Sequence, residues 1–135
     1  MRSVIVCLLL LSVVAFLGAT VTEKTAPSVE EPRYDANTEV SLLAIVTETR
    51  EVPPHDPLGG IHLLLKTETQ VLDAYLGPAA FIKQFEITFA KGDEVKVTGS
   101  KVKNGIRPHV ILVRELRKEL TTLSCRRANG APNWE

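Results

Sequence analysis

The sequence has few of the residues on which nucleic-acid binders and disulfide-rich proteins depend. Its 135 residues include two Cys, three His, one Trp, two Tyr and four Phe. Basic and acidic residues number 16 each, so the formal net charge is zero. A neutral chain exerts no general attraction on nucleic acid or anionic membranes, and few aromatic side chains leave little surface for stacking on bases. We therefore do not expect nucleic acid as a partner.

The two cysteines exclude an internal disulfide in the folded part. Cys7 lies in an N-terminal apolar run, which leaves Cys125 alone. A single cysteine has no intramolecular partner even where the compartment permits oxidation. We expect Cys125 to be a small, partly buried residue, with an intermolecular bond or a reactive thiol as the alternatives.

Recognisable catalytic motifs are also missing. The sequence contains no G-x-S-x-G, H-E-x-x-H or P-loop pattern, which are the motifs of serine hydrolases, zinc proteases and nucleotide-binding enzymes. His55 stands beside Asp56, but no nucleophile follows at a recognisable spacing. We expect no enzyme, no catalytic residue and no cofactor.

The first 19 residues have the order of a secretory signal. A short positive start precedes an apolar run from Val4 to Phe16, and Leu17-Gly18-Ala19 provides small residues for cleavage. A spanning helix needs about 20 apolar residues, more than this run has. We predict residues 1–19 to be a signal peptide and the protein to be periplasmic or extracellular. Only an uncleaved signal would bring it to a membrane.

The remaining chain divides into a tether and one domain. Residues 20–33 (TVTEKTAPSVEEPR) are polar, contain two prolines and show no apolar period, which is typical of disorder. Residues 34–135 suffice for one domain with its own core.

Five segments of the domain read as β-strands. They have alternating or continuous apolar residues and are rich in Val, Ile and Thr. The predicted strands are Glu39–Val52, Ile61–Thr67, Gln70–Leu76, Glu94–Lys103 and Arg107–Leu116. Leu120–Leu123 offers a short extra strand. The first half of the first strand is apolar on both faces, so we expect it to be buried on both, with the strand shared between two sheets.

Local signals add detail to the last two long strands and to the chain end. Gly99 inside a strand suggests a bulge, and Asn104-Gly105 is a strong hairpin signal. Near the C-terminus, Trp134 follows residues with turn chemistry, so we expect it to pack back on the domain.

A short apolar helix is predicted between the third and fourth strands. Gly77 can cap it, Pro78 suits its first turn, and Phe81 and Phe85 share a face four residues apart. Three strands, a helix and two strands is the plan of the OB-fold. We predict a mainly β fold, a five-stranded OB-fold barrel with one short helix between strands 3 and 4 that closes one end. An open α+β sandwich is the alternative.

Several stretches also resemble a known family. "GIHLLLKTE", "VLDAYLGPAAFI", "FAKGDEVKVTGSKV" and "NGAPNW" are similar to segments of small exported bacterial OB-fold proteins, mostly uncharacterised, and to the C-terminal domain of some magnetosome-associated proteins. The resemblance covers about Tyr34 to Trp134. It implies an OB barrel in the cell envelope and no established chemistry.

The chain departs from the pattern of that family at three places. Tyr75 stands where a histidine is common, and Ala80 stands where an aromatic residue is common. Cys125-Arg126 replaces what is often an Arg-Asp pair. If those positions form a site in relatives, part of it is missing here.

The candidate ligand-binding residues lie on the second and third strands and in the loop between the first two. His62, Leu64 and Lys66 alternate along the second strand, so they share one face. Tyr75 lies near the end of the third strand. The loop at residues 52–60, with His55, contains three prolines that lower the ordering cost of binding, and OB barrels usually bind ligands there.

Two further clusters have simpler explanations than a site. His55, His62 and His109 have no local metal-ligand spacing, so we predict no metal site. A basic cluster near the C-terminus is interleaved with glutamates and reads as a solvated face or a docking patch. It comprises Arg114, Arg117, Lys118, Arg126 and Arg127.

These observations predict a non-catalytic, exported OB-fold binding module of the bacterial cell envelope, with envelope stress as one candidate process. Its partner would be an envelope ligand or protein of unknown identity, and we expect a monomer. The first alternative is a single-stranded nucleic-acid-binding OB domain, which requires an uncleaved signal. The second is a metal or redox accessory domain that uses the histidines and Cys125.

Overall fold

The computed structural model describes residues 32–104 and 107–135. The predicted signal peptide, all but the last two residues of the predicted tether and the turn after Asn104 lie outside the described residues. None of the helices in the described part is long and apolar enough to cross a membrane.

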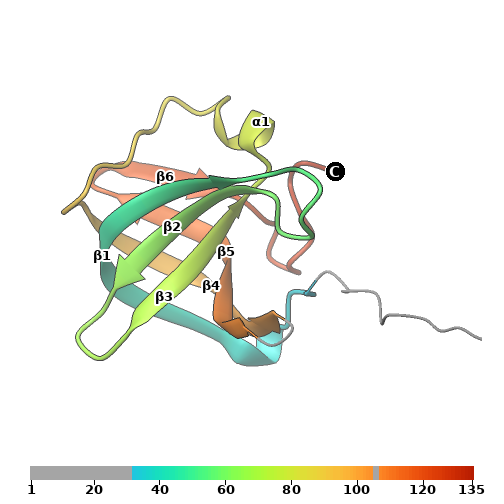
Figure 1. Ribbon diagram of the computed structural model, residues 1–135, viewed down its shortest axis with the longest axis horizontal. Helices are drawn as coiled ribbons and strands as arrows, with labels where there is room; N and C mark the ends of the chain where they lie inside the picture. Colours follow the sequence, from blue (N-terminus) through green and yellow to red (C-terminus); the bar gives the residue numbers. More distant parts are fainter. Residues whose placement is uncertain (1–31, 105–106) are drawn as a thin grey trace, which may run out of the picture.

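The described residues form a mainly β structure with one short α-helix between the third and fourth strands (Figure 1). The strands are β1 (Glu39–Val52), β2 (Gly60–Lys66), β3 (Val71–Gly77), β4 (Glu94–Asn104), β5 (Arg107–Lys118) and β6 (Thr121–Ser124). The helices are the 3-10 helix η2 (Ala36–Thr38) and α1 (Ala79–Ile82). The mainly β prediction is confirmed. The strand number is six rather than five, because the short segment after β5 pairs with β5.

The six strands make one sheet that closes into a ring. Their order is β3-β2-β1-β4-β5-β6, and neighbours in this order are antiparallel. A parallel pairing between β3 and β5 joins the two sides of the sheet. The long strand β1 has two partners along its length, since Glu39–Ile45 pairs with β4 and Ile45–Val52 pairs with β2. Both pairings belong to one sheet and not to the two sheets that were predicted.

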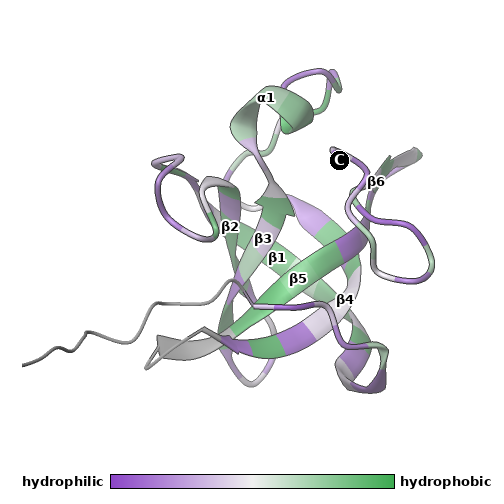
Figure 2. Cartoon of the chain, turned by 90° about the vertical axis from the view of Figure 1, so that its right-hand side faces the viewer, coloured by the Kyte–Doolittle hydropathy of each residue, from purple (hydrophilic) through white to green (hydrophobic). Residues whose placement is uncertain are grey.

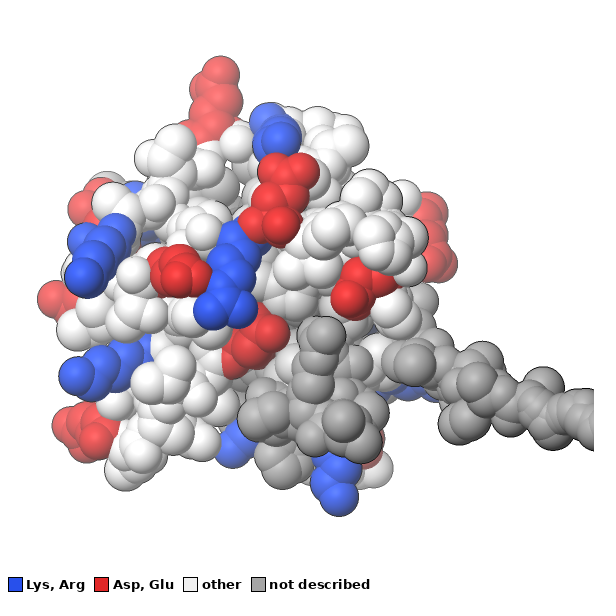
Figure 3. Space-filling view, in the orientation of Figure 1, with Lys and Arg blue, Asp and Glu red and all other residues white. Residues whose placement is uncertain are grey.

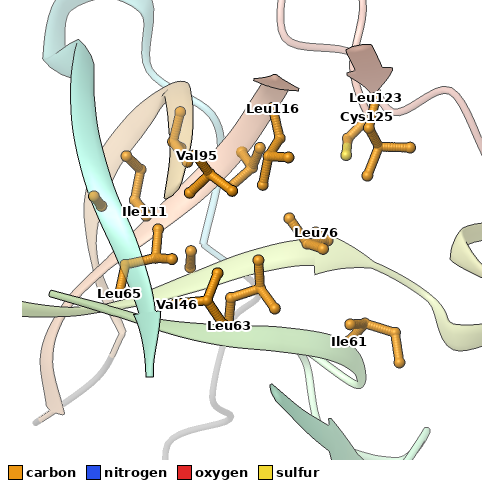
Figure 4. Packing of buried hydrophobic residues seen from close by; sticks show 14 of the residues in the cluster. Val46, Ile61, Leu63, Leu65, Leu76, Val95, Ile111, Leu116, Leu123 and Cys125 are labelled. Carbon is orange, nitrogen blue, oxygen red and sulfur yellow. The ribbon is translucent and has the colours of Figure 1, made fainter. Parts of the chain in front are cut away.

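The main core fills the inside of the ring. Figure 4 shows Val46 of β1, Leu63 and Leu65 of β2 and Ile111 of β5 pointing toward one another. The apolar character of β5 is plain in Figure 2. Gly99 lies at a register shift between β4 and β5, and a Cβ there would come within 2.2 Å of the Leu112 carbonyl oxygen. The predicted bulge is therefore confirmed, and this close approach requires glycine.

The outer face of the first half of β1 differs from the prediction. Ala44 and Val46 are buried, but Leu43 is 75% exposed and Ile45 is 45% exposed. The expectation that both faces would be buried is wrong, because no element of the described chain covers the outside of the ring at this point.

The helix α1 is shorter than predicted and begins later. Pro78 is its N-cap, and Gly77 belongs to β3 with a φ of +149°, which favours glycine. A Cβ at Gly77 would come within 2.9 Å of the Trp134 ring. Phe81 contacts Phe85 with ring centroids 5.1 Å apart, and Ile82 is buried in the main core. The helix thus packs over one end of the ring.

Candidate functional site

The predicted site residues of β2 and β3 do share the outer face of these strands. His62 pairs in register with Tyr75, and Lys66 pairs with Val71. Their exposure differs along the strands: His62 and Tyr75 are 5% and 3% exposed, whereas Leu64 is half-buried and Lys66 is exposed. The end of the face near His62 is therefore covered, while the other end is open.

The cover is the loop between β1 and β2, residues 53–59, which we call the 53–59 loop. It is tied to itself by hydrogen bonds from the Asp56 N–H to the Pro53 carbonyl (3.1 Å) and from the Gly59 N–H to the Asp56 carbonyl (2.9 Å). The Asp56 carboxylate accepts from the Leu58 N–H at 3.0 Å, as aspartate commonly does in turns. The result is a compact loop whose one large apolar side chain, Leu58, is 1% exposed.

Two side chains of the sheet hold the 53–59 loop in place. His62 Nε2 lies 2.6 Å from the Leu58 carbonyl oxygen, and the Tyr75 hydroxyl donates to the Gly59 carbonyl at 3.0 Å. His62 Nδ1 lies 2.8 Å from Asp73 Oδ1. Both ring nitrogens of His62 thus face acceptors, and only the doubly protonated imidazolium donates to both.

The surroundings of His62 favour this charged form. Burial is the largest single influence and lowers its pKa. The hydrogen bonds to Asp73 and to the Leu58 carbonyl, with the negative charges of Asp73 and Asp56, together outweigh it, so the pKa of His62 is raised above its usual 6.5. The geometry therefore holds the loop most firmly when His62 is protonated.

The 53–59 loop covers a second apolar cluster, on the outside of the ring. Leu58, Tyr75, Val110 and Leu112 form it. Val110 and Leu112 alternate along β5 with Ile111 and Val113, which face the main core. The parallel pairing of β3 with β5 places Tyr75 opposite Leu112, so the cluster exists only because the sheet closes.

The C-terminal tail borders the same cluster. Trp134 contacts the rings of Tyr75 at 6.1 Å and Phe81 at 5.5 Å between centroids, so the prediction that it packs back on the domain is confirmed. The Arg126 guanidinium lies 5.1 Å from the Trp134 ring centroid and 5.7 Å from that of Tyr34, and its Nη1 donates to the Gly130 carbonyl at 3.0 Å. In Figure 1 the tail and the 53–59 loop lie on the same side of the ring.

Cys125 is more deeply buried than expected. Its side chain is fully enclosed in the main core, and burial raises the pKa of its thiol to about 12. A thiol with so high a pKa is a poor nucleophile at neutral pH.

The remaining predicted residues do not gather at one place. His55 is exposed in the 53–59 loop, and the side chain of His109 lies outside the described residues. Among the residues that the structure describes, no group of three or more His, Cys, Asp or Glu side chains could hold a metal ion. On the face shown in Figure 3, basic and acidic side chains are interspersed, and neither sign dominates a large area.

Sequence reasoning missed the two residues that complete the covered site. Leu58 is the only large apolar residue between Pro53 and Gly60, and an isolated apolar residue in a Pro-Gly loop is a usable signal for an anchor. Asp73 interrupts the apolar run of β3 between Leu72 and Ala74. Its position on the outer face beside His62 follows from the strand register alone.

Comparison with known protein families gives a match to one family. The model of the MamS/MamX magnetosome protein family matches residues 44–123, a range that contains His62, Asp73, Tyr75 and the 53–59 loop. No curated protein and no solved structure matches the chain. The resemblance to magnetosome-associated proteins is therefore confirmed.

Proposed function

The chain belongs to the MamS/MamX magnetosome protein family, and we propose that it is a non-catalytic binding module exported to the bacterial cell envelope. We further propose that its closed ring is a barrel of the OB type. The order of the strands, the parallel contact of β3 with β5 and the helix between β3 and β4 support this assignment. OB barrels bind their ligands on the face of strands 2 and 3 and with the loop after strand 1.

The observation that carries the proposal is the apolar cluster outside the ring. A ring of this kind buries its main core inside, and a second apolar cluster on its outer face lies buried under the 53–59 loop. We infer that this surface becomes an interaction site when the loop moves aside. Here Tyr75, Val110 and Leu112 form such a surface, and Leu58 of the 53–59 loop occupies it. We infer that a ligand displaces the loop, which lies where OB barrels bind their ligands.

The contacts of the cover indicate the chemistry of the partner. His62 and Tyr75 direct two donors at the successive carbonyl groups of Leu58 and Gly59, while the apolar cluster encloses the Leu58 side chain. An extended protein segment with one aliphatic side chain would offer the same groups, since main-chain hydrogen bonds and one side-chain pocket suffice for such recognition. We infer that the 53–59 loop imitates a peptide ligand.

A peptide titration tests this proposal. The probe is the capped peptide PPHDPLGG, which has the sequence of residues 53–60. It is added to the isotope-labelled full chain carrying Leu58→Ala, and the backbone amide signals are followed. The proposal predicts saturable shifts in β2, β3 and β5. A control peptide with Ser in place of Leu should not bind.

A second arm of the titration tests the nucleic-acid alternative. The probe is a mixed-sequence single-stranded oligonucleotide at low salt, where electrostatic attraction is least screened. Saturable shifts on β2 and β3 with the oligonucleotide, and none with the peptide, would replace the peptide-binding proposal with nucleic-acid binding. Shifts with neither probe would contradict a ligand face under the loop.

A further inference from the structure

A groove lies on the outside of the ring, at the other end of β2 from the 53–59 loop. It has a volume of about 740 Å³ and is lined by residues of β1, β4 and the end of β5, and by the hairpin between β2 and β3. Two exposed aliphatic side chains, Leu43 and Ile45, lie in it. The length of β2 separates it from the loop by about 20 Å at 3.3 Å per residue.

The charged side chains of this groove follow a regular pattern. Four neighbouring chain segments line the groove, and each contributes a pair of residues at positions i and i+2; Ala44, Thr67 and Val95, which lie between the members of three of these pairs, also line it. These pairs are Lys66 and Glu68, Leu43 and Ile45, Glu94 and Lys96, and Arg117 and Glu119. One pair is aliphatic, and each of the other three consists of one basic and one acidic residue.

The strand register aligns these pairs across the sheet. Leu43 is opposite Lys96, which is opposite Arg117; Ile45 is opposite both Glu94 and Lys66. Because directly opposed residues of antiparallel strands point to the same face, the groove has two parallel rows. One row contains Leu43, Lys96 and Arg117 with Glu68 beside them. The other contains Ile45, Glu94 and Lys66, and Glu119 continues it past the end of β5.

None of these six charged residues has an ion-pair partner among the residues that the structure describes. Lys118, which lies between Arg117 and Glu119, is by contrast paired with Asp93 at 2.9 Å. The groove thus carries three positive and three negative side chains whose charges are available to another molecule.

We propose that the groove is a self-association surface, where a second copy of the chain binds around a two-fold axis. The axis lies in the plane between the two copies, perpendicular to the strands and midway between the two rows. A half-turn about this axis places each row of one copy over the other row of its partner. Leu43 then faces Ile45 of the other copy, Lys96 faces Glu94, Arg117 faces Glu119 and Lys66 faces Glu68. Such reciprocity is the defining property of an isologous interface.

The pattern favours a second copy over other occupants. The groove has no net charge, so a strongly acidic or basic partner, or an anionic membrane, gains no overall attraction there. A copy of the same chain satisfies all three charge pairs at once and covers both aliphatic side chains. The dimer would replace the monomer expected from the sequence, and it leaves the 53–59 loop uncovered for the binding role proposed above.

Charge reversal and charge exchange test the dimer. Light scattering gives the mass of the full chain, and dilution gives its dimerisation constant. Lys96→Glu and Glu94→Lys each place like charges opposite each other at two symmetric positions, so each should weaken dimerisation roughly tenfold or more. The double variant Glu94→Lys/Lys96→Glu exchanges the charges and should restore wild-type dimerisation. Mixing the two single variants should also restore it, because each then faces its complement.

Two controls keep the test specific. Arg127→Glu makes the same change of net charge as Lys96→Glu at an exposed position in the C-terminal tail, and dimerisation should be unchanged. Leu43→Asp removes one aliphatic contact from a side chain that is already exposed, so the fold should persist while the dimer is lost. A wild-type chain that stays at the mass of one copy at its highest soluble concentration would overturn the proposal. Association that neither reversal weakens, or that the exchange does not restore, would also overturn it.

Discussion

His62 and Asp73 are diagonal neighbours on β2 and β3, with Nδ1 and Oδ1 2.8 Å apart. Through the same imidazole ring, the carboxylate of one strand is connected to the backbone of the 53–59 loop, because Nε2 lies 2.6 Å from the Leu58 carbonyl oxygen. Asp56 adds a second negative charge from the loop, and Arg50, opposite His62 on β1, is paired with Glu48. Protonation of this one histidine therefore supplies a donor to the loop carbonyl and to the Asp73 carboxylate at the same time.

The stability of the loop should depend on pH. The pKa of His62 is raised in the folded protein above its usual 6.5, so its contribution is fully present below pH 6.5 and is lost as the pH rises through the raised value. Asp73→Asn removes the charged acceptor. We expect it to lower the free energy of unfolding by about 1–3 kcal/mol at acidic to neutral pH, and the difference from wild type to shrink at higher pH.

Chemical denaturation over a pH series measures this effect, and the histidine ring signals report the pKa directly. Glu51→Gln is the matched control, since Glu51 makes an exposed ion pair with Lys83 at 3.2 Å. It should change the free energy of unfolding by less than about 1 kcal/mol. A difference between wild type and Asp73→Asn that grows with pH would show that His62 is not the protonated partner.

Tyr75→Phe should loosen the 53–59 loop without disturbing the ring. The change removes the hydroxyl that donates to the Gly59 carbonyl at 3.0 Å and keeps the aromatic ring in the outer cluster. We expect a loss of about 0.5–1.5 kcal/mol in stability. Hydrogen exchange should quicken at Asp56 and Gly59 and stay unchanged in β4 and β5. Equal acceleration in all strands would argue against a local role.

Leu58→Ala should open the outer apolar cluster. Leu58 is 1% exposed, and removal of a fully buried leucine side chain costs about 2–5 kcal/mol. The variant should also bind an apolar fluorescent dye, because Tyr75 and Leu112 become accessible. Leu120→Ala is the control: Leu120 is fully exposed, so neither stability nor dye binding should change. If both variants behaved alike, Leu58 would not be an anchor.

The signal peptide is tested by the mass of the protein recovered after export. Cleavage after Ala19 yields a chain that begins at Thr20, because small residues before this bond suit signal peptidase. Intact-mass spectrometry of the exported fraction should show this chain. Recovery of the full-length chain in the cytoplasmic fraction alone would contradict export.

The strands were predictable from sequence because their signals are local. Alternation in β4, with Val95 and Val97 inside, and the Gly99 bulge required no knowledge of the rest of the chain. The helix was predicted to begin too early because Gly77 pairs with Ile61, and this pairing keeps Gly77 in β3. The sequence alone could not decide whether Gly77 caps the helix or ends the strand.

The site was predictable only in part, since its contacts join distant segments. The sharing of one face by His62 and Tyr75 followed from alternation along β2 and β3. Their burial depends on the contact of β3 with β5, which places Leu112 beside Tyr75 and creates the surface that Leu58 covers. The exposure of Leu43 was missed for a similar reason, because an apolar residue on the outside of a ring has the same local pattern as a buried one.

The most direct test of the account compares the affinity of the peptide PPHDPLGG for two proteins, the wild type and Leu58→Ala. If the 53–59 loop occupies the binding site of the partner, the peptide must displace the loop in the wild type but not in the variant. The account therefore predicts that the variant binds the peptide more tightly, with amide shifts on β2, β3 and β5. Equal affinity for the two proteins, or no binding to either, would contradict the claim that the loop covers a binding face.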